Sequence, residues 1–188
     1  MDDKDRKITG KQVIREIIHL ILYICIIILL TFLLLHFVGQ RTCVNGSSMN
    51  PSLSNGDNLI VDKLSYRLHD PERFDIIVFP FQYAEKKYYI KRIIGLPGEK
   101  IRIDDKGNIY INDKVLKESY GLEVIADPGI AKSGITLGED EYFVLGDNRN
   151  NSEDSRSPEV GVVKRDIIIG RAWLKIYPFR EIGFIKHQ

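Results

Sequence analysis

The hydrophobic pattern first separates an N-terminal apolar run from a longer mixed region. The run spans residues 17–40, contains no charged side chain and has no polar face. Folded as a helix it would be about 36 Å long, against a hydrocarbon core of about 30 Å. It is longer than the apolar core of a cleaved secretory signal, and the first alanine in the chain is Ala84. Because a buried core helix is rarely so uniformly apolar, the pattern predicts a single transmembrane helix over residues 17–38.

The charges on either side of the run predict its orientation. Residues 1–16 carry five Lys or Arg, whereas Arg41 is the only basic residue between the run and Lys63. The basic flank of a membrane helix stays on the cytoplasmic side. We therefore predict a cytoplasmic tail of residues 1–16, a single pass through the lipid bilayer of the plasma membrane, and an extracytoplasmic domain of residues 39–188.

The pattern after the run changes to short apolar or alternating segments separated by turn residues. The strands that we expect cover residues 58–63, 74–81, 87–95, 99–104, 108–116, 141–145 and 166–179. Asp105, Lys106 and Gly107 form a hairpin turn signal between two of them. Residues 119–138 contain four of the 15 glycines and are expected to form loops. The fold class is therefore mainly β: an antiparallel, barrel-like sheet domain after the transmembrane helix.

Composition narrows the chemistry. Lys and Arg number 27 against 26 Asp and Glu, without a basic run, so nucleic acid is not an expected partner. Cys25 and Cys43 lie in or next to the apolar run and cannot build a disulfide framework or metal cluster. Of the four histidines, two lie in the apolar run and one is the penultimate residue. We expect no metal, no other cofactor and no serine–histidine triad.

The segment of residues 43–53, just outside the run, contains a candidate nucleophile. It holds two adjacent serines, Ser47 and Ser48, between Gly46 and the Asn50-Pro51 pair. Pro51 disfavours helical backbone at Asn50, so the serines lie on an extended segment or turn. A hydroxyl here could act as a nucleophile, but such a segment is also typical of a polar linker between membrane and domain.

A serine nucleophile requires a base, and this chain offers a carboxylate or a buried lysine. Lys91 and Arg92 lie in the middle of an apolar strand, and alternation places them on opposite faces. Both faces are apolar, so periodicity does not choose between them. A guanidinium cannot lose its proton in a protein, whereas burial lowers the pKa of a lysine toward neutrality. Lys91 is therefore the candidate base, and the alternative is a lysine that extends to the sheet edge.

Residues 145–157 form a third polar stretch, rich in Asn, Asp, Ser and Arg, directly after an expected strand. Side-chain bonds to the backbone and an Arg–Asp pair can hold such a loop together. A calcium-binding loop is the alternative, but the spacing does not follow the Asp-x-Asn-x-Asp-Gly pattern.

Together these stretches resemble the sequence boxes of the bacterial type I signal peptidases, membrane-bound Ser/Lys endopeptidases. Residues 46–53 resemble the nucleophile box, 74–79 the substrate-binding strand, 91–99 the lysine box and 146–156 the last box. The resemblance implies that Ser48 is the nucleophile and Lys91 the general base. It implies supporting roles for Ser152, which would position the lysine, and for Asp147, Asn148, Asp154 and Arg156. The substrate-binding residues that it implies are Val44, Met49, Asp75, Ile76, Ile77, Val78 and Phe79.

The chain departs from the family pattern at a few positions. Phe74 replaces a common glycine, Asn150 a common aspartate and Ser52 a common threonine. Gly46 stands where enzymes of the enteric type carry a serine that helps to bind the oxyanion. The backbone N–H of Ser48 is therefore the expected oxyanion donor.

The resemblance implies cleavage of signal peptides from exported preproteins, after small residues at the −1 and −3 positions. The expected partners are these signal peptides, the lipid bilayer and, near the enzyme, the export machinery. Two alternatives remain open. One is a membrane-tethered Ser/Lys protease that cleaves other proteins or itself, and the other is an anchored β-domain that scaffolds without catalysis.

Overall fold

The computed structural model describes residues 10–37, 39–81 and 87–185, and it contains one long helix. Helix α1 runs from Gly10 to Phe37, and its segment Gly10–Phe32 is long and apolar enough to cross a membrane. The helix begins seven residues before the predicted boundary, since helical hydrogen bonds continue into the polar residues that precede Ile17. Of the expected tail, residues 1–9 lie outside the described residues, as does residue 38.

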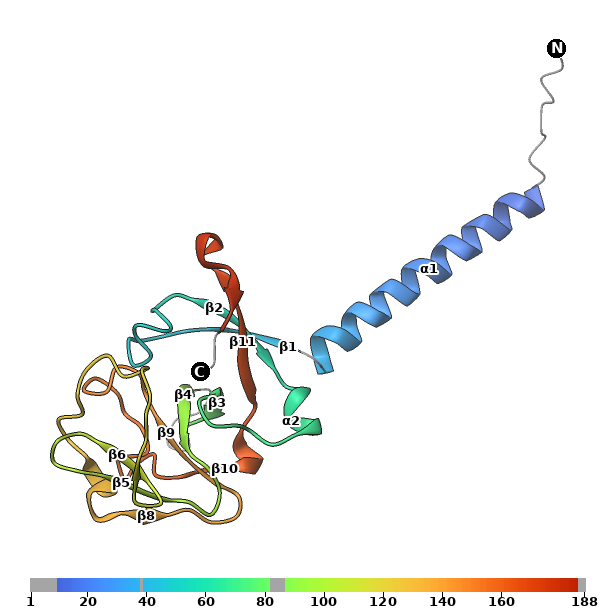
Figure 1. Cartoon of the computed structure of the whole chain (residues 1–188). Helices are drawn as coiled ribbons and strands as arrows, with labels where there is room; N and C mark the ends of the chain where they lie inside the picture. Colours follow the sequence, from blue (N-terminus) through green and yellow to red (C-terminus); the bar gives the residue numbers. More distant parts are fainter. Residues whose placement is uncertain (1–9, 38, 82–86, 186–188) are drawn as a thin grey trace. The chain divides into compact units, whose positions relative to one another are not determined.

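A second compact unit begins at Gly39 and is built from short strands (Figure 1). The strands are β1 (Gly39–Cys43), β2 (Asn58–Asp62), β3 (Ile76–Pro80), β4 (Tyr88–Gly95), β5 (Lys100–Ile103), β6 (Ile109–Ile111), β7 (Lys114–Val115), β8 (Ile135–Thr136), β9 (Glu141–Leu145), β10 (Val163–Lys164), β11 (Gly170–Tyr177) and β12 (Gly183–Phe184). The short helical turns are α2 (Ser65–Leu68), η1 (Gly129–Ser133), η2 (Arg165–Ile167) and η3 (Phe179–Glu181). The prediction of a mainly β domain is confirmed.

The strands of the described residues pair antiparallel in two sheets. The larger sheet has the order β1-β2-β11-β3-β4-β9-β10, with β12 pairing to β11, and the smaller has the order β7-β6-β5-β8. An apolar cluster joins the two sheets, with Ile94 of β4 and Phe143 of β9 packed with Ile101 and Ile103 of β5. In Figure 1, β5, β6 and β8 accordingly lie together beside β9.

The structure corrects several expected boundaries. Residues 108–116 form not one strand but the hairpin β6–β7, because Asn112 and Asp113 take positive φ angles of 49° and 63° and reverse the chain. The last long strand begins at Gly170 rather than residue 166, since η2 occupies Arg165–Ile167. The short elements β1, β10, β12 and α2 were not predicted, and neither was β8, which lies in the segment expected to form loops. Their sequences lack a long alternating pattern.

Two strand edges matter for the site. β1 is the terminal strand of the larger sheet, and within the part of the chain that the structure describes its one pairing partner is β2. β4 pairs with β3 from Tyr88 onward, but its pairing with β9 begins only at Arg92. Residues 88–91 of β4 therefore pair with β3 on one side but not with β9 on the other. This half of β4 exposes one edge, as a terminal strand does, although β4 lies in the middle of the sheet order.

Candidate active site

Ser48 lies in a tight turn that follows β1 and is anchored by apolar side chains. Met49 and Leu53, on either side of the turn, are fully buried in a cluster with Leu59 of β2 and Ile76 of β3. The backbone N–H of Leu53 donates to the carbonyl of Met49, which closes the turn. Burial of neighbouring residues thus fixes a polar segment that sequence composition alone would assign to a linker.

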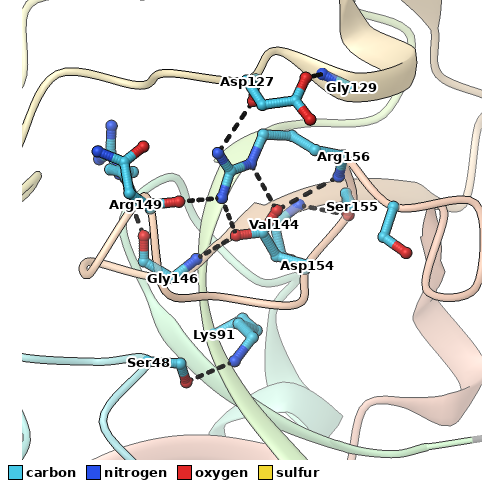
Figure 2. Close-up of polar contacts among 12 residues, drawn as sticks. Ser48, Lys91, Asp127, Gly129, Val144, Gly146, Arg149, Asp154, Ser155 and Arg156 are labelled. Atoms are coloured by element: carbon cyan, nitrogen blue, oxygen red, sulfur yellow. Dashed lines mark hydrogen bonds and ion pairs between the residues drawn. The ribbon is translucent and has the colours of Figure 1, made fainter.

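Lys91 of β4 lies opposite this turn, and its Nζ donates to Ser48 Oγ at 2.7 Å. Figure 2 shows the amine directed at the hydroxyl. The lysine is only 4% exposed. Burial lowers the pKa of Lys91 to about 8, although the negative charges of Asp154, Glu153 and Asp147 act in the opposite direction. A lysine in this state is neutral in a usable fraction of molecules near neutral pH.

Arg92, the next residue, points to the other face of β4 and has a different environment. Its guanidinium makes a bidentate ion pair with Asp147, at 2.8 and 2.7 Å. It also donates to the carbonyl of Phe74 at 2.9 Å and to Ser52 Oγ at 3.2 Å. These bonds connect the turn that carries Ser48, β4 and the loop after β9, so Arg92 has a structural role here.

The loop after β9 holds the Ser48 turn from the other side. Asn148 donates from its backbone to the carbonyl of Ser48 at 3.0 Å and from its side chain to the carbonyl of Ser47 at 3.1 Å. Asn151 donates to Ser47 Oγ at 2.9 Å. Gly146 permits this approach, because a Cβ at this position would lie 2.5 Å from the Ser48 carbonyl oxygen.

Asp154 and Arg156 organise the same loop, as Figure 2 shows. The guanidinium of Arg156 pairs with both carboxylate oxygens of Asp154 at 2.8 and 2.9 Å, and it also donates to the carbonyls of Asp127 and Arg149. Asp154 in turn accepts the backbone N–H of Gly146 at 3.0 Å. The bond to Asp127 ties residues 119–138 to this loop, which gives that excursion a structural role.

Ser152 does not make the contact with the lysine that the sequence analysis expected. Its Oγ is buried and has no hydrogen-bond partner among the described residues. It lies against Gly146, where a Cβ on the glycine would be only 2.2 Å from it. The direct hydrogen-bond partner of Lys91 Nζ is Ser48.

A cavity of about 490 Å³ lies beside Ser48 and Lys91. Val44 and Met49, both expected to bind substrate, contribute to its lining. The expected substrate strand does not: Asp75 and residues 76–79 are buried within the sheet, because β4 and β11 flank β3. The strand residues that line the cavity instead are Thr42, Cys43, Tyr88, Tyr89 and Ile90.

Sequence reasoning therefore missed part of the cavity wall. Thr42, Cys43 and Asn45 were not predicted to bind substrate, because their segment lacks alternation, and Tyr88 was assigned only to a strand. Asn151 and Glu153 also line the cavity, and they were overlooked inside the polar loop. Alternation along the strand places Tyr89, two residues before Lys91, on the same face as the lysine, and both residues line the cavity.

Two departures from the family pattern have visible consequences. Phe74 has a φ of 72°, a conformation that favours glycine, and its ring lies 5.3 Å from that of Tyr120. Gly46 also has a positive φ, 108°, and its N–H donates to Asn55 Oδ1 at 2.9 Å. The N–H of Ser48 donates to none of the described residues, so it is free to bind a ligand atom.

Comparisons with known proteins show the family to which the chain belongs. A family model described as "Signal peptidase, peptidase S26" matches residues 15–177. The probable signal peptidase I-2 of Synechocystis sp. is 42% identical over 154 residues, which cover 79% of this chain and 68% of the relative. Signal peptidase I T of Bacillus subtilis is 35% identical over 170 residues, covering 85% of this chain and 84% of the relative.

Among solved structures, the crystal structure of a signal peptidase I from Enterococcus faecalis is 37% identical to this chain, with a TM-score of 0.45. The match covers 55% of this chain and 97% of that one. The family match spans the turn that carries Ser48, the strand that carries Lys91 and the loop after β9 together. The resemblance found in the sequence motifs is confirmed, and the chain belongs to the signal peptidase family, peptidase S26.

Proposed function

We propose that this chain is a membrane-anchored serine endopeptidase that removes signal peptides from exported preproteins, with Ser48 as nucleophile and Lys91 as general base. The observation that carries the proposal is the 2.7 Å hydrogen bond between Lys91 Nζ and Ser48 Oγ at the wall of a cavity. Membership of the peptidase family makes the chain a serine endopeptidase. The geometry supports a particular pair of residues for its chemistry.

The proposed reaction is acyl transfer. Neutral Lys91 takes the proton of Ser48 as Oγ attacks the scissile carbonyl carbon, and the resulting ammonium then protonates the leaving amine. The C–N bond breaks and an acyl-serine forms. Lys91, neutral again, removes a proton from a water molecule that attacks this ester, and Ser48 regains its hydrogen.

The carbonyl oxygen becomes negative during both steps and requires a hydrogen-bond donor. The backbone N–H of Ser48 is available for this role, because it has no partner among the described residues. Asn148 and Asn151 hold the turn that presents this N–H, so they support the site without touching the reacting atoms.

The substrate is proposed to bind as an extended strand in the cavity. The free edge of β1 and the uncovered edge of residues 88–91 both line it, and each offers backbone groups for pairing. Val44 and Met49 supply apolar contacts near Ser48. We propose that the restricted space there favours small residues at the −1 and −3 positions of the substrate. Asp75 to Phe79 act indirectly in this scheme, because β3 pairs with β4 and holds it in place.

Helix α1 supplies the proposed membrane anchor. Its length and composition fit one crossing of a lipid bilayer. Lys and Arg are more numerous before the apolar run, in residues 1–16, than in the segment that follows it, which favours a cytoplasmic N-terminus and a β unit on the outer side of the plasma membrane. This location brings the enzyme near the export machinery, where preproteins emerge.

The proposal is tested by incubating the purified full-length protein with a preprotein and sequencing the new N-terminus. Cleavage after a small residue is expected for the wild type. Ser48→Ala, Lys91→Ala and Lys91→Arg should each lose roughly 10³-fold or more in kcat/KM, because nucleophile and base act as one unit. The exposed Lys132→Arg provides a matched control and should retain wild-type turnover.

The outcomes separate the alternatives. Near-normal turnover by a folded Lys91→Arg enzyme would contradict the dyad, since arginine cannot act as a base. Cleavage after bulky residues would indicate a protease with other substrates. Failure of the wild type both to cleave and to react with an acylating inhibitor would favour a scaffold without catalysis.

A further inference from the structure

The cavity beside Ser48 and Lys91 contains a carboxylate that lacks a basic partner. Glu153, in the loop after β9, lines the cavity together with both residues. Its Oε2 accepts a hydrogen bond from the hydroxyl of Tyr89. Within residues 39–81 and 87–185, no ion pair of Glu153 with a lysine or arginine is formed. Among the described residues, no lysine or arginine therefore offsets its negative charge by direct contact.

The other carboxylates that act on Lys91 differ in this respect. Besides Glu153, these are Asp147 and Asp154. Asp147 is paired in bidentate fashion with Arg92, and Asp154 with Arg156. Each of these two charges is offset by a guanidinium in direct contact. Glu153 is thus the carboxylate whose field at Lys91 is not offset by an adjacent arginine.

Tyr89 holds Glu153 near the lysine. Lys87, Tyr89 and Lys91 lie two residues apart on β4 or next to its start, and the two Nζ atoms each lie 5.1 Å from the centre of the Tyr89 ring. Burial and the contact with Glu153 raise the pKa of Tyr89, so its hydroxyl stays a donor to the carboxylate. Lys87 also lines the cavity, and its positive charge opposes that of Glu153 at Lys91.

We propose that Glu153 is a positioning residue: its charge, held beside Lys91 by Tyr89, sets the pH range in which the Ser48–Lys91 dyad works. This inference rests on the proposed dyad. A negative charge stabilises the ammonium form of the lysine, so Glu153 delays formation of the neutral base to higher pH. The positive charge of Lys87 has the opposite effect. The balance between Glu153 and Lys87 thus sets the acidic limb of the pH profile, which is the pH range over which activity rises as Lys91 loses its proton.

The test measures kcat/KM of the full-length enzyme in detergent against pH, at constant and low ionic strength because salt screens such effects. Glu153→Gln should move the acidic limb to lower pH by about half a unit, which gives about threefold higher activity well below the midpoint. Lys87→Gln should move the limb to higher pH, and the double variant should return toward the wild-type position. Glu153→Asp keeps the charge and should restore most of the wild-type profile.

Controls separate an electrostatic role from a structural one. Glu139→Gln removes the same charge from an exposed position outside the cavity and should leave the limb in place. A Glu153→Gln limb that coincides with the wild type, or a uniform loss of activity without a shift, would overturn the proposal. An acidic limb that persists in residual activity of Lys91→Ala would instead refute the dyad and this inference with it. The rate of acylation of Ser48 by an active-site inhibitor gives a second readout of the same limb, independent of peptide binding.

Discussion

Arg92 and Asp147 form a bidentate ion pair in which each side chain is only 1% exposed. The guanidinium lies one residue from Lys91, yet the two cations have opposite environments because successive strand residues face opposite sides. Arg92 has a carboxylate partner and holds three segments together. Lys91 has Ser48 Oγ as its hydrogen-bond partner and a lowered pKa. The strand thus separates a structural cation, Arg92, from the proposed general base, Lys91.

Loss of Asp147 should destabilise the β unit strongly. Asp147→Ala leaves a buried guanidinium without its counterion, which typically costs about 3–5 kcal/mol. Urea unfolding of the full chain in detergent, followed by fluorescence of the single tryptophan Trp173, measures the loss. Asp105→Asn breaks the exposed pair with Lys132 and should change stability far less. Equal effects of the two substitutions would contradict the role of the buried pair.

The stability of the enzyme should depend on Lys91 in a pH-dependent way. The folded-state pKa of about 8 lies below the ordinary 10.5, so the unfolded state binds the proton more tightly. Below pH 8 the buried charge lowers the free energy of unfolding by its full amount, about 3 kcal/mol. Between pH 8 and 10.5 this cost disappears, because the folded lysine is already neutral. Lys91→Met should therefore be more stable than wild type at pH 7, by a margin that shrinks as the pH rises. A margin that stays constant in urea titrations from pH 7 to 10.5 would refute the lowered pKa.

Gly146 should tolerate no side chain. A Cβ there would lie 2.2 Å from Ser152 Oγ and 2.5 Å from the main-chain oxygen of Ser48, and the latter cannot rotate away. Gly146→Ala should displace the nucleophile turn, lowering kcat by at least tenfold and stability by about 1–3 kcal/mol. Gly183→Ala is the matched control, since a Cβ at 183 meets no atom within 4 Å. Preprotein cleavage and urea unfolding of both variants check this, and normal kcat in Gly146→Ala would show that the close approach is dispensable.

Cys43 offers a chemical probe of the substrate cavity. Its side chain is exposed and lines the cavity that contains Ser48. A charged maleimide should label Cys43 and block cleavage by occupying the space for an extended peptide. Cys43→Ser should resist the block, whereas Cys25→Ser, altered in α1, should remain sensitive. Full activity of an enzyme shown by mass spectrometry to be labelled at Cys43 would place the substrate elsewhere.

The orientation of the chain can be tested with intact protoplasts. Externally added protease should digest the β unit and leave the N-terminal segment before α1 intact, because the basic flank is retained on the cytoplasmic side. A tag at the N-terminus and an antibody to the β unit report the two regions. Protection of the β unit in sealed protoplasts, with digestion after lysis, would reverse the proposed orientation.

Much of the fold follows from local pattern. The apolar run predicted α1, and alternation around Ile101 and Ile103 predicted β5, because period and hydrophobicity are properties of neighbouring residues. The short elements β1 and β10 were missed, since strands of this kind are defined by their partners. Asn112 and Asp113 reverse the chain inside an apparent strand, and only the pairing of β6 with β7 reveals the turn.

The sequence by itself determined which side chains could carry the chemistry. The absence of suitable histidines and the buried setting of Lys91 reduced the candidates for a base, and the motif resemblance then selected the pair with Ser48. These inferences depend on residue type and on spacing along the chain, and both can be read directly from the sequence.

Tertiary structure alone decided how those residues meet. Residues 48 and 91 come together because Met49 and Leu53 anchor the turn in the core while β4 carries the lysine past it. The same packing places β3 between β11 and β4, so the strand residues of the cavity wall come from β1 and β4 rather than from the expected strand. The approach of Glu153 to the lysine, through Tyr89, also depends on this packing. Contacts between residues so far apart in the chain arise from packing and desolvation, which no local pattern encodes.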